Sequence, residues 1–355
     1  MEHHEYTAEA TALLMSLIAT PSVSRDEDRA ATLLKRKMDE YGLKPQRTGN
    51  NVWAVGAGFD SQKPTLLLNA HIDTVRPVAS WTRDPFRPTL EGDRLYGLGS
   101  NDCGGGLVSL LQAFRVITSR RQAYNTVFLA SAEEEVSGAG GIVRALPLIP
   151  APSVAIVGEP TGMQPAVAEK GLMVLDITAH GTAGHAARRE GVNAIYKMAD
   201  DIDRLRRLRF DRTSEFLGDT VVSVTCINAG TQHNVIPDKC TAVADVRTNE
   251  HYTNEEVYKI ICSCVDSEVK ARSFRLSSSH IDTGHPLVRR CVEMGMTPFG
   301  SPTLSDQALM PFLSFKLGPG DSSRSHSADE YIYIGEIDGA IKTYIELLDG
   351  GEIKS

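Results

Sequence analysis

Hydrophobic and polar positions alternate along the chain in two different ways. Between Thr65 and about Gly171, short apolar runs bounded by turn residues alternate with longer stretches of helical periodicity. Apolar runs at residues 66–68, 127–130 and 154–157 predict buried strands separated by helices. This βαβαβ order predicts a mostly parallel sheet with helices on its faces.

Residues 172–284 follow a different order. Strands are predicted over residues 172–179, 220–227, 240–247 and 269–276, with helices over residues 193–208 and 254–265. The resulting order, βαββαβ, is that of a ferredoxin-like module. After residue 284 the first pattern returns, with a helix, a buried strand and a final helix over residues 286–294, 312–317 and 336–348. The expected division is therefore one α/β domain of residues 1–171 and 285–355, with residues 172–284 as an inserted domain.

Composition and charge exclude several classes of protein. Of the 355 residues, 41% are hydrophobic and 23% are charged, which excludes collagen-like, coiled-coil and wholly disordered chains. The 37 basic and 45 acidic side chains give a net charge of −8 without a long basic run, so we expect no nucleic-acid partner. No uncharged run reaches the ~18 residues of a membrane helix, so we expect no membrane partner.

The six cysteines are few for this length and show no zinc-finger spacing. Reduced thiols in a cytosol fit this usage best, so we expect a cytoplasmic protein. Cys262 and Cys264 lie two residues apart in a predicted helix, where they face different sides, and we assign them no metal.

Residue types that bind metals follow the predicted strands. His71 and Asp73 end the first apolar run, Asp102 precedes a run of glycines, and the acidic triplet 133–135 and Glu159 follow the next two strands. The carboxyl ends of parallel strands meet at one edge of a sheet, so we expect these side chains to converge. One histidine with several carboxylates suits zinc, manganese or cobalt.

Each of these residues also has a structural interpretation. An aspartate before glycines usually caps a turn or helix, and an acidic triplet is usually a solvated face. Their shared position after buried strands favours the metal site, because an unsolvated carboxylate there needs a cation. Residues i and i+2 of an extended chain point the same way, so the Asp73 carboxylate is predicted to accept a hydrogen bond from the second ring nitrogen of His71.

Several short segments occur in a fixed order along nearly the whole chain. They cover residues 69–75, 99–102, 131–135, 157–161, 184–185 and 318–320, followed by His326. Their order and spacing resemble the M20 metallopeptidase and deacylase family, most closely its acetylornithine deacetylases. The resemblance implies that the larger domain is catalytic and that the inserted domain is a lid through which two chains form a homodimer.

The resemblance also implies two zinc ions per chain, which cobalt can replace. One ion would be held by His71 and Glu159 and the other by Glu135 and His326, with Asp102 bridging both. A bridging anion makes physical sense between two neighbouring cations.

Catalytic and substrate-binding roles come from the same resemblance. Glu134 would be the general base and then the general acid of amide hydrolysis, with Asp73 orienting a metal ligand. Sequence physics alone does not separate the three glutamates of the triplet. His185 of the partner subunit would stabilise the oxyanion, although it could instead cap a helix. Asn234 and Arg247 would hold the substrate carboxylate, although Arg247 could instead form a structural ion pair.

The chain departs from the family pattern after Asp102, where many relatives have Met-Lys-Gly-Gly. Here Cys103 and three glycines follow, so the lysine is missing. Cys103 could be a nucleophile or a soft zinc ligand, but the carboxylates already complete both metal shells. We therefore expect a buried spectator thiol.

The implied activity is removal of the acyl group from an N-acyl-L-amino acid. The candidate substrates are N-acetyl-L-ornithine, N-succinyl-L-ornithine and N-acetylcitrulline, in arginine biosynthesis. Alternatives within the family are a succinyl-diaminopimelate desuccinylase and a small aminopeptidase or dipeptidase. A non-catalytic binding protein on the same fold is a further alternative, against which the complete ligand set argues.

Overall fold

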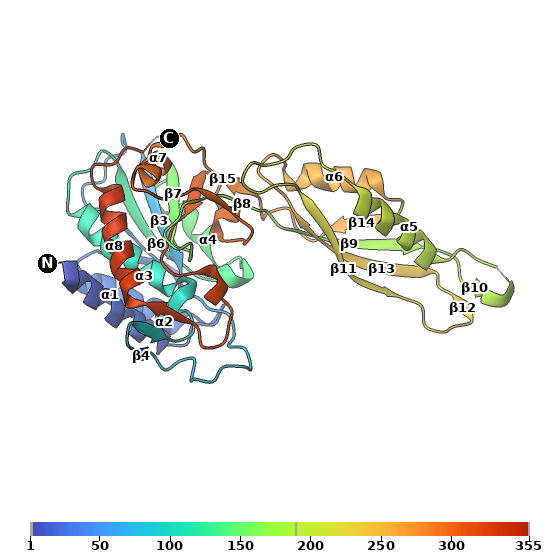
Figure 1. Ribbon diagram of the computed structural model, residues 1–355, viewed down its shortest axis with the longest axis horizontal. Helices are drawn as coiled ribbons and strands as arrows, with labels where there is room; N and C mark the ends of the chain where they lie inside the picture. Colours follow the sequence, from blue (N-terminus) through green and yellow to red (C-terminus); the bar gives the residue numbers. More distant parts are fainter. Residues whose placement is uncertain (1–2, 189, 354–355) are drawn as a thin grey trace. The chain divides into compact units, whose positions relative to one another are not determined.

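A computed structural model describes residues 3–188 and 190–353 (Figure 1). The chain forms two compact units, one from the described residues of 1–167, 281–299 and 305–355, the other from residues 168–280 and 300–304. Because the second unit interrupts the first along the chain, the predicted α/β class with an inserted module is confirmed. Within the described residues, no helix is both long enough and apolar enough to cross a bilayer.

The first unit is built on a twisted sheet whose central strands are parallel. Its strands run in the order β1-β2-β6-β3-β7-β17, and the pairs β6–β3, β3–β7 and β7–β17 are parallel. The edge strands β1 and β2 pair antiparallel, which the sequence does not predict. The bounds are β1 Gln46–Thr48, β2 Asn51–Val55, β3 Thr65–His71, β6 Asn125–Ser131, β7 Val154–Val157 and β17 Leu313–Lys316.

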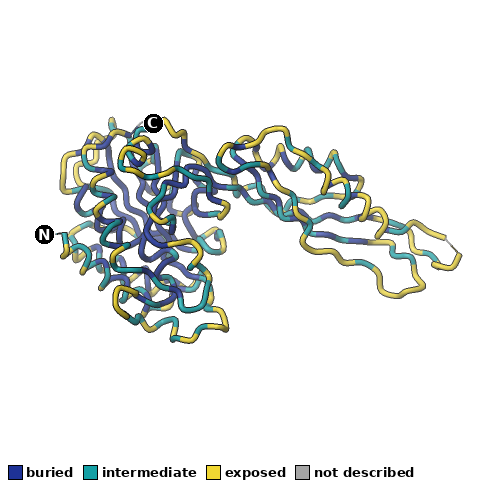
Figure 2. Tube along the Cα trace, viewed as in Figure 1, coloured by how far each residue is buried: buried dark blue, intermediate teal, exposed yellow. Residues whose placement is uncertain are grey.

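Helices cover both faces of this sheet. On one face α1, α3 and α8 pack against one another, and α3 contacts β3 and β6. On the other face α4 closes an apolar cluster that includes Leu67, Val127 and Ala155. The central strands are buried along their whole length (Figure 2). The helices are α1 His3–Ile18, α2 Asp28–Glu40, α3 Gly105–Thr118, α4 Ile142–Ala145, α7 Pro286–Glu293 and α8 Ile334–Leu348.

A small second sheet in this unit joins segments that are far apart in sequence. Its three antiparallel strands are β4 Thr89–Glu91, β5 Arg94–Tyr96 and β18 Tyr331–Tyr333, in the order β18-β5-β4. None of these short strands is predicted from the sequence. Through β18, the sheet ties the C-terminal segment to the residues that precede Asp102.

Gly106 lets the start of α3 approach the end of β7. A Cβ atom at Gly106 would lie 1.8 Å from the carbonyl oxygen of Gly158. This contact brings the segment of Asp102 close to Glu159, which follows Gly158 directly.

Gly106→Ala is expected to lower the free energy of unfolding by about 1–3 kcal/mol, the usual cost of overpacking. Gly339→Ala, in α8, is the matched control, because a Cβ atom there meets nothing within 4 Å and alanine favours a helix. Urea unfolding of the two variants measures the difference. Equal stability of the two would show that α3 and β7 are not in this close contact.

The second unit has the ferredoxin-like topology. Its antiparallel sheet has the order β11-β13-β9-β14, and α5 and α6 pack on one face over Leu175 and Ile177. The last strand is shorter than predicted, because the Ser273 hydroxyl accepts a hydrogen bond from the Arg275 N–H and starts a turn. The elements are β9 Met173–His180, α5 Ala194–Arg207, β11 Val221–Ala229, β13 Lys239–Arg247, α6 Asn254–Cys264 and β14 Glu268–Ala271.

Short strands complete the chain. A two-stranded sheet of β10 Gly184–His185 and β12 Val235–Ile236 lies at one end of the second unit (Figure 1). The strands β8 Ala166–Glu169, β15 Ser279–His280 and β16 Phe299–Ser301 lie where the sequence passes from one unit to the other.

Candidate metal centre

Two histidines and four carboxylates converge at the carboxyl edge of the parallel strands. The Nε2 atom of His71 lies 3.2 Å from Asp102 Oδ1 and 3.7 Å from Glu159 Oε1. It also lies 3.9 Å from Glu134 Oε2. The fold therefore brings the predicted residues of successive strand ends to one place.

The second histidine approaches the same cluster from the C-terminal part of the chain. His326 Nε2 lies 3.0 Å from Glu135 Oε2 and 3.6 Å from Asp102 Oδ2. The two oxygens of Asp102 thus face different histidines. This arrangement is what a carboxylate shared by two cations requires.

The orientation of His71 differs from the prediction in one respect. Its Nδ1 atom hydrogen-bonds the backbone carbonyl oxygen of Asp73 at 2.9 Å, whereas the Asp73 carboxylate is 3.6 Å away. The prediction was wrong because β3 ends at His71, so the rule for extended chains no longer applies at Asp73. A proton on Nδ1 leaves the lone pair of Nε2 directed at the acids.

The Asp73 carboxylate instead fixes the segment that carries the glutamates. It accepts hydrogen bonds from the Ser24 hydroxyl at 2.7 Å and from the N–H groups of Glu134 and Glu135 at 3.0 and 3.2 Å. Glu27, which is fully buried, accepts a hydrogen bond from the preceding N–H, that of Glu133, at 3.2 Å. Two buried carboxylates therefore bind three consecutive backbone donors.

The three glutamates of the triplet have different surroundings. The Glu133 carboxylate faces a glycine-rich loop and accepts a hydrogen bond from the N–H of Gly140 at 3.2 Å. A Cβ atom at Gly138 or Gly140 would collide with this carboxylate. Glu134 and Glu135 face the two histidines, so the structure separates Glu133 from the other two.

The pKa shifts reflect an excess of negative charge. Burial, reinforced by the charge of Asp102, raises the pKa of Glu159 to about 8. Burial also raises the pKa of Glu134 well above its usual value. The hydrogen bond with Glu135 raises the pKa of His326 to about 9. Burial opposes ionisation of Asp102, but the hydrogen bond with His71 and the charges of His71 and His326 together outweigh it and lower the pKa.

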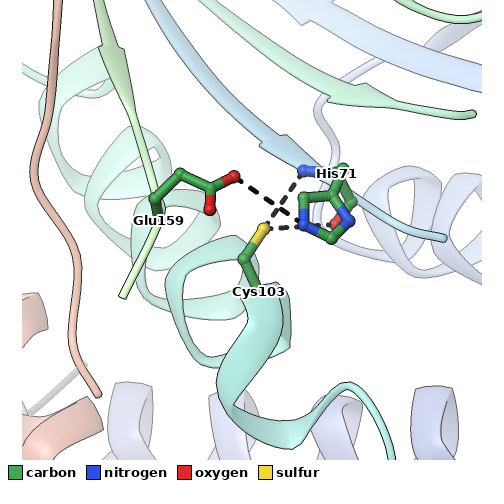
Figure 3. Close-up of side chains that lie close together, drawn as sticks. All are labelled: His71, Cys103 and Glu159. Carbon is green, nitrogen blue, oxygen red and sulfur yellow. Dashed lines mark hydrogen bonds and ion pairs between the residues drawn. The ribbon is translucent and has the colours of Figure 1, made fainter. Parts of the chain in front are cut away.

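Cys103 lies beside His71, as Figure 3 shows. Its Sγ atom accepts a hydrogen bond from the His71 N–H at 3.2 Å, and burial raises the pKa of the thiol. Cys103, His71 and Glu159 each offer one potential ligand atom within 4.8 Å of the others, as do His71, Asp102 and Glu135. The thiol is therefore buried, as predicted, and contacts the backbone of a candidate ligand.

A separate observation indicates that this donor set fits a metal centre. Glu159 Oε1 is buried, and it has no hydrogen-bond partner among the described residues. An unsatisfied buried carboxylate oxygen is costly unless a cation compensates it. Imidazole nitrogen and carboxylate oxygen are ligands that zinc accepts, so the cluster could hold two such ions.

The predicted residues of the second unit occupy two separate places. His185, which is exposed, pairs with Val235 in the two-stranded sheet, and the Ala186 N–H donates to the Asn234 carbonyl oxygen at 3.0 Å. Arg247 ends β13, where its Nε and Nη2 atoms donate to the two carboxylate oxygens of Asp245 at 2.7 and 3.1 Å. His185 and Asn234 are therefore neighbours, and Arg247 is engaged in an ion pair.

Comparison with known proteins identifies the family. A family model described as a peptidase dimerisation domain matches residues 167–272, and one described as peptidase family M28 matches residues 51–148. The chain is 30% identical to acetylornithine deacetylase of Proteus mirabilis strain HI4320 over 356 residues, covering 90% of this chain and 91% of that protein. The chain belongs to the M20 family. It is accordingly a hydrolase, and the family predicted from the sequence is confirmed.

Several solved structures share its fold. Aminopeptidase PepT of Bacillus cereus ATCC 10987 has a TM-score of 0.76 at 17% identity, with 98% of each chain covered. The M20 family metallo-carboxypeptidase Sso-CP2 of Sulfolobus solfataricus has a TM-score of 0.73 at 18% identity, covering 96% of this chain and 98% of that one. The YXEP protein of Bacillus subtilis, a dinuclear metal binding peptidase, has a TM-score of 0.74 at 18% identity, covering 97% and 98%.

Several supporting residues of this M20 hydrolase are not predicted from the sequence. Ser24 and Glu27 lie in the N-terminal segment, and Glu330 lies just before β18. Glu27 and Glu330 act on backbone groups 106 and 228 residues away, so no local pattern reveals them. Their only signal is an acidic residue beside an apolar run, which is common in exposed positions as well.

Proposed function

We propose that this M20 hydrolase removes the acyl group from an N-acyl-L-amino acid, with N-acetyl-L-ornithine as the foremost candidate substrate. The observation that carries the proposal is the 30% identity to an acetylornithine deacetylase along 90% of the chain. The convergence of the predicted metal ligands at one sheet edge supports it. The proposal includes a role in arginine biosynthesis and residence in the cytoplasm, and none of the six cysteines is in a disulfide.

Two zinc ions per chain are the proposed cofactors. His71 and Glu159 would hold one ion, Glu135 and His326 the other, and Asp102 would be shared. The chemistry that zinc supplies at such a site is Lewis-acid activation of the amide carbonyl and of the attacking water.

Glu134 is the proposed proton carrier. Its carboxylate lies in the cluster near His71, whereas His326 contacts Glu135. The Asp73 carboxylate fixes the backbone of both Glu134 and Glu135. It would take a proton from the attacking water and then pass a proton to the departing amine nitrogen. Asp73 would keep both Glu134 and His71 in position, the latter through its carbonyl oxygen.

The proposed active site includes residues of the second unit from two chains. Arg247 and the His185–Asn234 pair lie at opposite ends of β13, and eight residue steps at ~3.4 Å put roughly 27 Å between these ends. Residues so far apart in one chain cannot hold one small substrate together. We therefore assign Arg247 to the substrate of one subunit, and Asn234 and His185 to that of its partner, where His185 would stabilise the oxyanion.

Exposed apolar side chains in the second unit support a homodimer. The edge strand β11 exposes Val221 and Ile227, at 44% and 57%, and α5 exposes Tyr196 at 71%. The outer edge of such a strand, together with exposed apolar side chains, favours pairing with a second copy. The match of residues 167–272 to a peptidase dimerisation domain points the same way.

Peptide hydrolysis is the second candidate function. Similar structures include an aminopeptidase and a metallo-carboxypeptidase, both of which cleave amide bonds. Steady-state rates on acetyl-ornithine, succinyl-ornithine, acetylcitrulline, succinyl-diaminopimelate and short peptides test the choice. The highest kcat/KM on a peptide would reject the deacylase.

Metal removal is expected to abolish activity. We expect about two zinc ions per chain, loss of activity in chelator, and recovery with zinc or cobalt, because the ligands would hold the only Lewis acid of the site. Elemental analysis and rates measured before and after chelation check this. Full amidase activity in a metal-free preparation would contradict the proposed function.

A further inference from the structure

Glu330 is a buried carboxylate that binds the backbone of the segment that carries Asp102. The residue is 2% exposed. Its Oε1 atom accepts hydrogen bonds from the N–H groups of Asn101 at 2.8 Å and Asp102 at 2.9 Å. Its Oε2 atom accepts one from the N–H of Gly99 at 3.0 Å. Three backbone donors on one carboxylate offset part of the cost of burying it.

Asn101 joins the same two segments through its own side chain, which reaches from residues 99–102 to residues 321–325. Its Nδ2 atom donates to the Asp321 carbonyl oxygen at 3.0 Å and to the Ser325 hydroxyl at 3.3 Å. Its Oδ1 atom accepts a hydrogen bond from the Asp321 N–H at 3.0 Å. Residues 99–102 and 321–330 are therefore held together by side chains from both segments.

The candidate ligand His326 lies between these contacts. Ser325 precedes it directly, and Glu330 follows four residues later. The His326 side chain is 56% exposed, so packing does little to fix it. Its distance from Asp102 Oδ2, 3.6 Å, depends on how the two segments are joined.

We propose that Glu330 is a positioning residue that sets the separation of Asp102 and His326 and thereby the affinity for the ion that they share with Glu135. This inference rests on the metal-binding roles proposed above. It differs from a general stabilising role, because it predicts a larger loss of affinity at the ion site of His326 than at that of His71.

Glu330→Gln is the sharpest variant. Glutamine has nearly the same shape, but its NH2 group would face backbone N–H donors, so one acceptor is replaced by a donor. Contacts outside the ligand shell typically change metal affinity 10- to 100-fold. We expect zinc to bind at least ~10-fold more weakly at the site of His326, with a smaller loss at the site of His71, which shares only Asp102 with it.

Zinc per chain is measured after dialysis of the holoenzyme against buffers of defined free zinc. The wild type should fill two sites, and Glu330→Gln should show one binding step that is weakened more than the other. Glu330→Asp keeps both acceptor oxygens on a shorter side chain. Its zinc affinity at the weakened step should therefore lie between those of the wild type and Glu330→Gln. If Glu330→Gln does not fold, wild-type zinc binding by Glu330→Asp would overturn the inference.

Asp201→Asn in the second unit is the matched control. Asp201 is 1% exposed and accepts hydrogen bonds from the N–H groups of Asp266 and Ser267, each at 3.0 Å. Its replacement is the same chemical change away from the metal centre, so it should lower stability and leave zinc binding unchanged. Wild-type zinc binding by Glu330→Gln, or equal weakening of both steps, would overturn the inference.

The outcome of this experiment can be told apart from the outcome of the tests of the proposed function. A wild type that binds two zinc ions but hydrolyses no N-acyl amino acid would refute the function and leave this test intact. A wild type that hydrolyses the substrate, with unchanged zinc binding by Glu330→Gln, would refute only the inference. A wild-type chain that binds no zinc would refute both.

Discussion

Glu134→Gln is expected to lower kcat at least ~100-fold while both zinc ions stay bound. This factor is the low end of what general acid–base catalysis contributes. The amide fills the same space, but it cannot carry a proton between water and the leaving nitrogen. Steady-state kinetics and elemental analysis of the same preparation measure the two properties.

Variants of the two neighbouring glutamates separate the roles within the triplet. Glu135→Gln should lose zinc, because Glu135 contacts His326 at the proposed second ion. Glu133→Gln is the matched control and should stay active, since its remaining carbonyl oxygen can still accept the hydrogen bond of Gly140. Zinc loss in Glu134→Gln with zinc retention in Glu135→Gln would mean that base and ligand are exchanged.

An equimolar mixture of Glu134→Gln and His185→Ala chains is expected to regain about a quarter of wild-type activity after subunit exchange. Each chain alone should be nearly inactive, because one lacks the proton carrier and the other lacks the partner's oxyanion donor. After exchange about half of the dimers are mixed, and each mixed dimer holds one complete site. The assay compares rates before and after subunit exchange.

A neighbouring histidine supplies the control for this experiment. The exposed His180 side chain forms an ion pair with the exposed Glu268, at 3.2 Å. Dimers of His180→Ala chains should therefore be active without being mixed with a second variant. Demonstrated exchange without recovery would show that His185 acts in its own chain or is purely structural.

The convergence of the site is predictable because it follows from topology. A histidine or acid at or just beyond the carboxyl end of a buried parallel strand must lie at the sheet edge, and this holds for His71 and Glu159. The contact of the Asp73 carboxylate is not predictable, because it depends on where β3 stops being extended. The contacts of Glu27 and Glu330 also escape prediction, because they join backbone and side chain across more than a hundred residues.

The central place of β17 has a consequence for how the chain is made. β17 covers one edge of β7, and β3 covers the other, yet the whole second unit is synthesised between β7 and β17. A nascent chain on the ribosome therefore carries an apolar strand edge that stays open until residue 316 has emerged. Open edges of this kind recruit other chains, so products that end before residue 313 are expected to aggregate.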